Sequence, residues 1–244
     1  CELGRRYNAG VGVPQDRKAA AGWLLKAAQQ GHAEAQYYIA EYCRRGLGGV
    51  AQDDKAAFEW FLKAARQGHA GAQMNVGIAF EHGRGVAQDH TQALAWYLKA
   101  AQQGDAQAQC NAAHFFEQGR GGVAVDHKAA LDLYLKAAHQ GLAEAQAGAG
   151  FCFYEGKGTP QDFSQAFAWF RKAAAQGDAR GAHMVGLSYS RGRGVPQDFK
   201  QAAHWYEKAA RQGHAPAEYN LAVLYARGDG VAQDRSEEHT SELQ

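Results

Sequence analysis

The chain has 244 residues, of which 46% are hydrophobic and 21% charged, and its formal net charge at pH 7 is +1. This length and composition suit a globular core, and the near-neutral charge gives no reason to expect nucleic-acid partners or an acidic membrane surface. No apolar run approaches the roughly 18–20 residues of a membrane-spanning helix, so we expect no membrane insertion.

An aspartate recurs along the whole chain at intervals of 36 or 37 residues, and a tryptophan usually follows it seven residues later. The recurring aspartates are Asp16, Asp53, Asp89, Asp126, Asp162, Asp198 and Asp234. The residues seven positions after the first six are Trp23, Trp60, Trp96, Leu133, Trp169 and Trp205, which include every tryptophan of the chain. A fixed period of this length indicates a stacked repeat protein.

The two ends of the chain differ from the rest. The first residue is Cys1, and the chain opens within the repeating pattern, so we expect that its natural start is missing. Residues 235–244 resemble a translated sequencing adapter, and the pattern fails there: Glu238 and Ser241 stand where Ala and Trp are expected. We therefore expect truncation at both ends and a non-native tail over 235–244. The sequence leaves cytoplasm, periplasm and secretion open as locations.

Each aspartate is predicted to begin a helix, which we call the second helix of its unit. The carboxylate can accept hydrogen bonds from the free N–H groups of the first helical turn, so aspartate suits the N-cap. Apolar residues spaced by three and four, such as Ala57, Trp60 and Ala64, give this helix one buried face. Glycines suited to the left-handed position are expected to close these helices. They are Gly31, Gly68, Gly104, Gly141, Gly177 and Gly213.

A helix that we call the first helix of the next unit follows each of these glycines, as at Ala33–Arg45, and ends at another glycine, Gly46. Its packed face carries Ala or Gly two, four and nine residues after the closing glycine, an aliphatic residue or Ala at eight, and mostly aromatic residues at twelve. Small residues let helix axes approach to about 8–10 Å. The segments 46–50 and 119–123 each hold one extra glycine, which marks them as loops.

One such helical hairpin cannot cover its own apolar face, so neighbouring hairpins must stack. We therefore predict an all-α fold in which residues 1–234 form one solenoid domain of about six hairpins. The burial of a tryptophan side chain of about 150–250 Å² is expected to contribute roughly 4–6 kcal/mol per repeat before the entropy cost.

The repeating residues A-x-A-Q-x-x-[IVL]-[GA]-x-x-[YF]-x-x-G-x-G-V-x-Q-D-x-x-x-A-x-x-W-x-x-K-A-A-x-x-G resemble the Sel-one-like repeat (SLR) family, a longer-loop relative of the tetratricopeptide repeat. The resemblance covers residues 1–234. It implies a right-handed α/α superhelix and an adaptor that assembles protein complexes, with many bacterial members exported or acting at the cell envelope. It does not imply an enzyme.

Candidate chemical groups have structural interpretations. One branch of the family carries a disulfide in each repeat, but no repeat here holds a cysteine pair, so we expect Cys43, Cys110 and Cys152 to pack as small hydrophobes. His32, His69 and His214 share one repeat position, which provides too few neighbouring ligands for zinc. We therefore expect neither a metal nor a cofactor, and histidine or aspartate at that position suits the start of a first helix.

The loops and the last turns of the second helices also have structural interpretations. The G-x-G segments follow a helix and complete no phosphate-binding motif. The basic residues Arg84, Arg120, Lys157 and Arg193 lie between loop glycines and are expected to form a solvated edge rather than a nucleic-acid track. A lysine recurs three residues after the tryptophan position, where its charge offsets the helix dipole and its stem covers the ring. These lysines are Lys26, Lys63, Lys99, Lys136, Lys172 and Lys208.

Positions that vary between repeats are free to recognise a partner, whereas constant positions serve packing. By analogy with tetratricopeptide repeats, first-helix positions six and ten residues after the closing glycine face a concave groove, and they are often apolar or aromatic. Such a strip suits a bound peptide or helix. The candidate groove residues are Tyr37, Glu41, Met74, Ile78, His114, Phe151, His183, Leu187, Tyr219 and Val223. The alternative is that these side chains pack against the neighbouring repeat.

The function we expect from the sequence is a non-catalytic scaffold that binds a protein or peptide. No nucleophile motif or acid–base constellation is present. Two alternatives stay open: an exported, cell-envelope or hydrolase-like member of the cysteine-rich branch, and the regulatory module of a larger enzyme.

Overall fold

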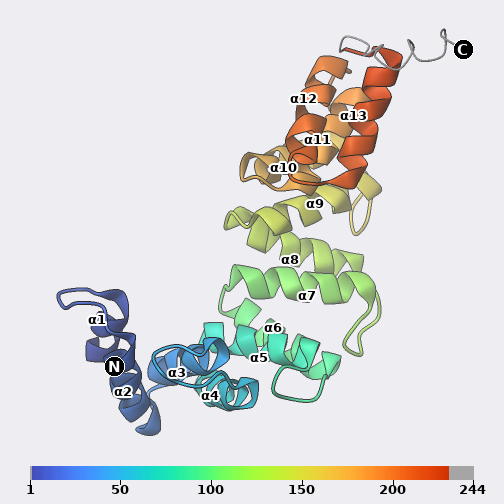
Figure 1. The fold of residues 1–244 in the computed structure, drawn as a ribbon. Helices are drawn as coiled ribbons and strands as arrows, with labels where there is room; N and C mark the ends of the chain where they lie inside the picture. The colour runs from blue at the N-terminus through green and yellow to red at the C-terminus, as the bar shows by residue number, and fades with distance from the viewer. Residues whose placement is uncertain (1, 231–244) are drawn as a thin grey trace, which may run out of the picture. The chain divides into compact units, whose positions relative to one another are not determined.

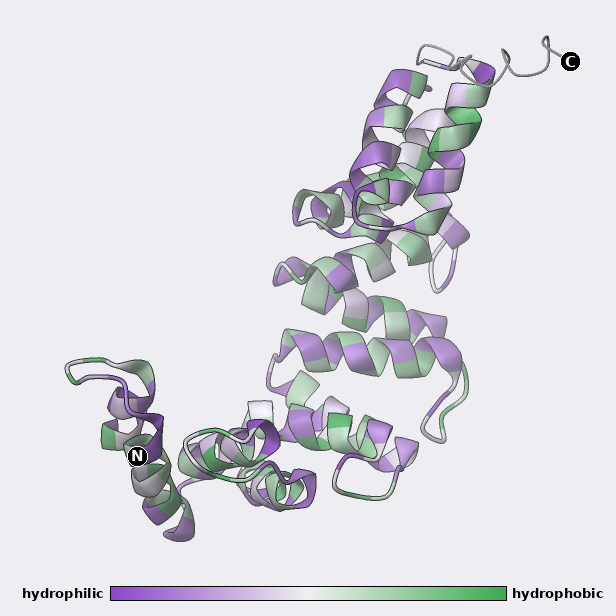
Figure 2. Cartoon of the chain, viewed as in Figure 1, coloured by the Kyte–Doolittle hydropathy of each residue, from purple (hydrophilic) through white to green (hydrophobic). Residues whose placement is uncertain are grey.

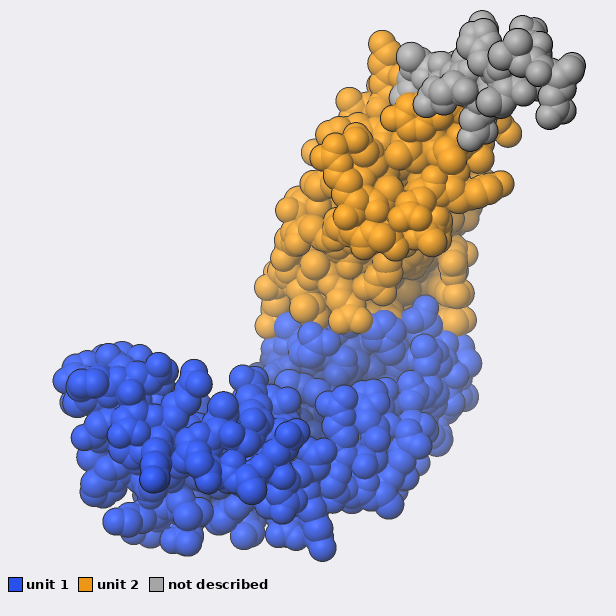
Figure 3. Space-filling model, viewed as in Figure 1, with its two compact units in different colours: residues 1–125 blue, residues 126–244 orange. Residues whose placement is uncertain are grey.

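The computed structural model describes residues 2–230, which form thirteen α-helices and no strand (Figure 1). Cys1, the seventh aspartate Asp234 and the predicted tail 235–244 lie outside the described residues. The chain divides into two compact units, residues 1–125 and 126–244 (Figure 3). We describe each unit by itself.

The unit of residues 1–125 contains seven helices, in which first and second helices alternate. They are α1 (Glu2–Ala9), α2 (Arg17–Gln29), α3 (Ala33–Arg45), α4 (Asp54–Arg66), α5 (Ala70–His82), α6 (His90–Gln102) and α7 (Ala106–Gln118). Successive helices pack on one another throughout this unit. The odd-numbered helices are the first helices and the even-numbered ones the second helices.

The unit of residues 126–244 continues the same alternation with six helices. They are α8 (His127–His139), α9 (Ala143–Glu155), α10 (Phe163–Ala175), α11 (Ala179–Arg191), α12 (Phe199–Ala210) and α13 (Ala215–Arg227). Hydrophobic and hydrophilic residues are interleaved along the helices of both units (Figure 2), as expected for helices with one packed face.

The predicted helix starts and stops are confirmed. All six aspartates before second helices are N-caps whose carboxylates accept backbone N–H bonds, as Asp89 does from Thr91 and Gln92 at 2.9 and 3.0 Å. The first helices end at glycines in the left-handed conformation, such as Gly83 with φ of 67°. The first-helix N-caps vary more: His69 bonds Ala72 N through Nδ1, whereas His32 makes no such bond.

Alanines, glycines and one aromatic column form the core. Four of the fully buried rings lie on second helices, eight residues after the aspartate: Tyr97, Tyr134, Phe170 and Tyr206. Tyr42 and Phe115 are buried rings of first helices. Glycines of the preceding first helix face rings of the second helix: a Cβ on Gly77 of α5 would lie 2.6 Å from the Tyr97 ring of α6. The predicted small residues thus allow a ring to lie against a helix backbone. The predicted cysteine packing is confirmed for Cys43, Cys110 and Cys152, which are all buried.

A ladder of buried glutamines joins successive hairpins. Gln36 donates to Ala28 O at 3.1 Å and accepts from Gln67 Nε2 at 2.7 Å. Gln73 repeats both bonds, with Ala65 O and Gln103. A buried amide without hydrogen-bond partners would lower the stability of the fold, and the ladder provides those partners. Because hydrogen bonds are directional, the ladder also fixes how successive hairpins pack at an otherwise apolar interface.

The prediction of a buried tryptophan in every repeat is only partly right. Trp96 and Trp169 are buried, but Trp23 is 45% exposed. The Trp169 ring is covered by His139 of the preceding second helix, with centroids 5.2 Å apart. No second helix precedes α2 in the described residues, so nothing equivalent covers Trp23. The rings that close the core are therefore those of the column that contains Tyr97.

Candidate binding clefts between first helices

Candidate residues six positions after the closing glycine contact the next hairpin of their own unit. Tyr37 of α3 stacks on His69, with ring centroids 4.6 Å apart, and lies 5.7 Å from the Phe61 ring. His183 of α11 makes the equivalent contacts, 4.9 Å to His214 and 5.7 Å to Tyr206. These side chains are half-buried and take part in the packing between hairpins.

The remaining candidates differ in exposure. Met74 packs against a small alanine cluster of α6 and α7, and Phe151 packs edge-on against Phe170 at 5.0 Å. His114 is half-buried. Tyr219, on the last described helix, is 71% exposed. The ten candidates therefore do not form one uniform exposed strip.

Five candidates line clefts between successive first helices, and in two of these clefts residues of a second helix form the floor. We call these cleft A, between α1 and α3; cleft B, between α3 and α5; and cleft C, between α11 and α13. Cleft A, of about 330 Å³, is lined by Asn8, Arg17, Tyr37, Tyr38, Glu41, Tyr42, Arg45 and Leu47. Cleft B, of about 250 Å³, is lined by Arg44, Asp54, Ala57, Phe58, Phe61, Asn75, Ile78, Ala79 and Arg84. Cleft C, of about 200 Å³, is lined by Leu187, Ser190, Arg191, Phe199, Tyr206, Asn220, Val223, Leu224, Arg227 and Asp229.

The three clefts use the same positions of the repeat. The candidates at ten residues after the glycine appear in all of them, as Glu41, Ile78 and Val223. Each cleft has an apolar or aromatic lining, and each also includes two arginines and one acidic residue. The sequence analysis identified the first-helix residues but missed the floor and the loop residue that follows the first helix.

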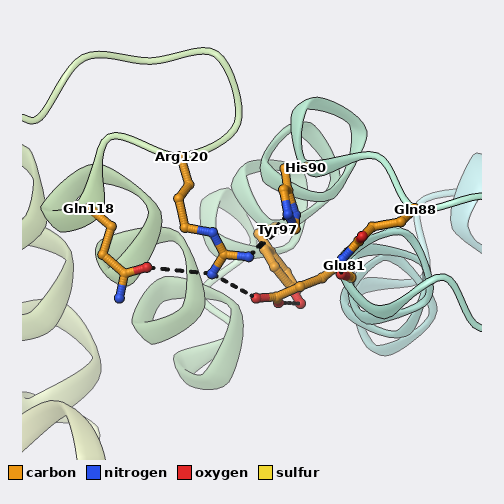
Figure 4. Close-up of polar contacts among 6 residues, drawn as sticks. All are labelled: Glu81, Gln88, His90, Tyr97, Gln118 and Arg120. Atoms are coloured by element: carbon orange, nitrogen blue, oxygen red, sulfur yellow. Dashed lines mark hydrogen bonds and ion pairs between the residues drawn. The ribbon is translucent and has the colours of Figure 1, made fainter.

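Between α5 and α7, an arginine side chain occupies the space that corresponds to the open clefts. Arg120, the loop residue after Gly119, lies 3.3 Å from Glu81 Oε1 and 3.3 Å from His90 Nδ1 (Figure 4). Its guanidinium lies 4.7 Å from the centroid of the Phe115 ring. Tyr97 also donates to Glu81, at 2.7 Å. We call this arrangement the closed cleft.

A second arginine does the same between α9 and α11. Arg193 Nη1 donates to Tyr154 Oη at 2.6 Å, and the guanidinium lies 5.1 Å from the centroid of the Phe163 ring. The predicted solvated basic edge is therefore wrong for Arg120 and Arg193, because an acceptor and an aromatic face across the gap draw their guanidinium groups inward. Arg120 and Arg193 each connect two successive first helices, Arg120 within the unit 1–125 and Arg193 within the unit 126–244.

The loop glycines have a packing reason. A Cβ on Gly85 would collide with the Asp54 carbonyl, and one on Gly194 with the Phe163 carbonyl, so each loop lies directly on the first turn of the second helix before it. This contact places the residue before each glycine, Arg84 or Arg193, at the mouth of its cleft. The prediction that packing rather than phosphate binding accounts for the G-x-G segments is consistent with this geometry.

Burial and neighbouring groups shift the pKa values of three side chains in or near these clefts. Burial, followed by the bond to Glu81, raises the pKa of Tyr97, so the hydroxyl stays protonated and donates. Burial, followed by His214 and Arg191, lowers the pKa of His183 to about 4. A hydrogen bond to Glu41 raises the pKa of Arg44, which stays charged beside cleft B.

The lysines near the tryptophans bind the rings through the ammonium group. Nζ of Lys63 and Lys99 each lie 4.1 Å from the centroid of the tryptophan three residues earlier, Trp60 and Trp96. The lysine stem was expected to cover the tryptophan ring, and the ammonium group also makes a cation–π contact with it. Such a contact contributes about 0.5–1 kcal/mol at exposed sites. This column lies on the second helices and does not line clefts A, B or C.

Stacked helical hairpins with inter-hairpin clefts define a class of α/α repeat scaffolds. A sequence profile described as "Sel1 repeat" matches residues 1–32, 33–69, 70–105, 106–142, 143–178, 179–214 and 215–237. The chain belongs to the Sel1 repeat family, as the resemblance implied. Among curated protein sequences, none matches the chain. None of the described helices has the length and hydropathy needed to cross a membrane.

Solved structures of bacterial proteins share the fold. A protective antigen from uropathogenic Escherichia coli strains, which displays an SLR fold, is 34% identical, with a TM-score of 0.88; the match covers 96% of this chain and 50% of the antigen. A Sel1 repeat protein from Oxalobacter formigenes is 38% identical, with a TM-score of 0.76, over 91% of this chain and 64% of its own. The chain thus spans half to two thirds of the length of these relatives.

Proposed function

We propose that this chain is a non-catalytic scaffold that binds a segment of another protein on the surface of its first helices, at clefts A, B and C. The observation that carries the proposal is the recurrence of a cleft with an aromatic or apolar lining at one position of the repeat. Family membership supports the scaffold role.

The sizes of clefts B and C favour a protein segment over a small molecule, whereas cleft A, of about 330 Å³, is at the lower end of the small-molecule range. Small-molecule sites commonly enclose about 300–1,000 Å³ and bury most of the ligand. Cleft B holds about 250 Å³ and is open on one side, which suits a single side chain of an extended segment. Clefts A and B lie one repeat apart within the unit 1–125, which lets one segment place successive side chains in them, as peptide-binding grooves do.

The candidate residues have unequal roles in this proposal. Ile78, Leu187 and Val223 form apolar cleft walls, whereas Tyr37 and Glu41 line cleft A. Met74, His114, Phe151 and His183 support these helices by packing, and Tyr219 lies exposed at the edge of the same surface.

Selection of a phage-displayed random twelve-residue peptide library on the immobilised chain tests the proposal. We expect enrichment of related peptides on the wild type and a loss of at least tenfold in their binding to Ile78→Asp. The matched control is Leu25→Asp, an exposed apolar residue of a second helix. No enrichment on the wild type, or equal losses in both variants with intact helical circular dichroism, would contradict the proposal.

A further inference from the structure

We propose that cleft B is specific for a segment that places an aspartate or glutamate side chain beside a bulky apolar side chain, and that Arg84 binds the carboxylate. This inference rests on the proposed function and names the chemistry of its partner. It comes from comparing cleft B with the closed cleft one repeat further along the same unit.

The closed cleft contains its own carboxylate. Glu81 lies at the end of α5, and its two oxygens face the Tyr97 hydroxyl at 2.7 Å and Arg120 at 3.3 Å. The first helix α5 provides the acid, and the loop after α7 provides the arginine, so the protein itself fills the site with an acid–arginine pair. Figure 4 shows Arg120 between Glu81 and His90.

Cleft B has the arginine of this pair without an acid at the position of Glu81. Its own carboxylate, Asp54, stands where the closed cleft has His90 and makes no ion pair with Arg84 among the residues that the structure describes. Arg84 occupies the loop position of Arg120, whereas Arg44 stands where the closed cleft has Glu81. Arg44 is bound to Glu41 by two contacts, at 2.7 and 3.3 Å. Among the residues that the structure describes, Arg84 has no ion-pair partner within 4 Å. Like charges on Arg44 and Arg84 disfavour the inward position that Arg120 adopts, and the cleft stays open.

The floor of cleft B determines the second part of the ligand. Phe58 and Phe61 of α4 and Ile78 of α5 line the cleft, and its volume of about 250 Å³ far exceeds that of a single water. An apolar side chain there removes these surfaces from water, and a neighbouring acidic residue then reaches Arg84 at the mouth. A guanidinium binds a carboxylate well because two parallel N–H bonds fit its two oxygens.

The test compares peptide selections on the wild-type chain, on Arg84→Gln and on the control Arg66→Gln, an exposed arginine of α4. Library peptides are fused to the coat protein through their C-termini, so a selected carboxylate can come only from a side chain. We expect aspartate or glutamate next to a large apolar residue to be enriched at least tenfold on the wild type and on Arg66→Gln. On Arg84→Gln the apolar preference should persist and the acidic preference should fall to the library background.

The outcomes separate the two proposals. Enriched peptides without an acidic residue, or an acidic preference that Arg84→Gln leaves unchanged, would overturn the role of Arg84 while leaving the scaffold function standing. The absence of any enrichment on the wild type would overturn the scaffold function as well. Arg84→Leu serves as a second variant should the glutamine variant not fold, because Leu47 occupies the same loop position of cleft A in this chain.

Discussion

Arg120 reaches from the loop after α7 to Glu81 at the end of α5, with 3.3 Å between guanidinium nitrogen and carboxylate oxygen. The pair joins two first helices across the second helix between them. Where the corresponding residues are Arg44 and Arg84, the charges are alike and the cleft is open. Two positions of the repeat thus distinguish a closed cleft from an open one in this unit.

Removal of the Glu81 carboxylate should destabilise the unit of residues 1–125. Glu81→Ala leaves the Tyr97 hydroxyl and Arg120 without their acceptor, at an expected cost of about 1–3 kcal/mol in the free energy of unfolding. Glu81→Gln keeps an acceptor for Tyr97 and should cost less. Urea unfolding followed by circular dichroism measures both, and a loss as large for glutamine as for alanine would contradict the bridging role.

The close approach of a ring to a helix backbone predicts opposite effects for two glycine substitutions. Gly77→Ala places a Cβ 2.6 Å from the Tyr97 ring, and overpacking of this kind costs about 1–3 kcal/mol. Gly22→Ala on α2 meets nothing within 4 Å and should gain up to about 1 kcal/mol from helix propensity. Thermal melts of the two variants test the contrast; equal shifts would show that the ring does not require glycine.

The buried glutamine ladder predicts that replacing one of its glutamines lowers the free energy of unfolding by more than the size of the side chain alone would suggest. Gln73→Ala removes one donor to Ala65 O, which keeps the Gly68 N–H, and leaves Gln103 Nε2 without its acceptor. We expect about 1–3 kcal/mol of lost stability. Gln102→Ala, an exposed residue of α6, is the control and should stay within about 0.5 kcal/mol of the wild type. Equal stabilities would argue against the ladder.

The contact between the His183 and His214 rings, with centroids 4.9 Å apart, predicts acid sensitivity. The ordinary histidine pKa is about 6.5, and the folded chain lowers that of His183 to about 4. Unfolding therefore takes up a proton between these values, and stability that is present above pH 6.5 is lost as the pH falls towards 4. The urea midpoint of His183→Gln should depend less on pH in this range than that of wild type or His82→Gln, an exposed control; parallel curves would contradict the assignment.

The sequence predicted the helices well because their signals are local. The proposed first helix Ala33–Arg45 has those bounds in the structure, and the aspartate caps and glycine stops lie within one turn of the helices that they define. The glutamine of the A-x-A-Q motif was visible as Gln36, Gln73, Gln109 and Gln146, with Ala182 and Glu218 at its position in the last two first helices. Its partners lie eight and about thirty residues away, beyond any local pattern.

The candidate site was less predictable, because it depends on where long side chains point. Arg84 and Arg120 occupy the same repeat position, and only the residue across the gap, Arg44 or Glu81, distinguishes them. The sequence contained that difference, but the pairing of these positions becomes visible only when two first helices lie side by side. The burial of the tryptophans was overestimated for a related reason: it depends on a side chain of the preceding hairpin that covers the ring.

The most direct test of the account is to convert the open cleft B into a closed one. Arg44→Glu reproduces the acid of the closed cleft, so Arg84 should fold inward onto the introduced carboxylate as Arg120 does onto Glu81. The measurement is the affinity of the peptide most enriched on wild type, by fluorescence anisotropy, for wild type, Arg44→Glu and the control Arg66→Glu. We predict at least a tenfold loss for Arg44→Glu alone, with its helical circular dichroism unchanged. Equal affinity for all three proteins would contradict the claim that charge at these two positions opens the cleft for a partner.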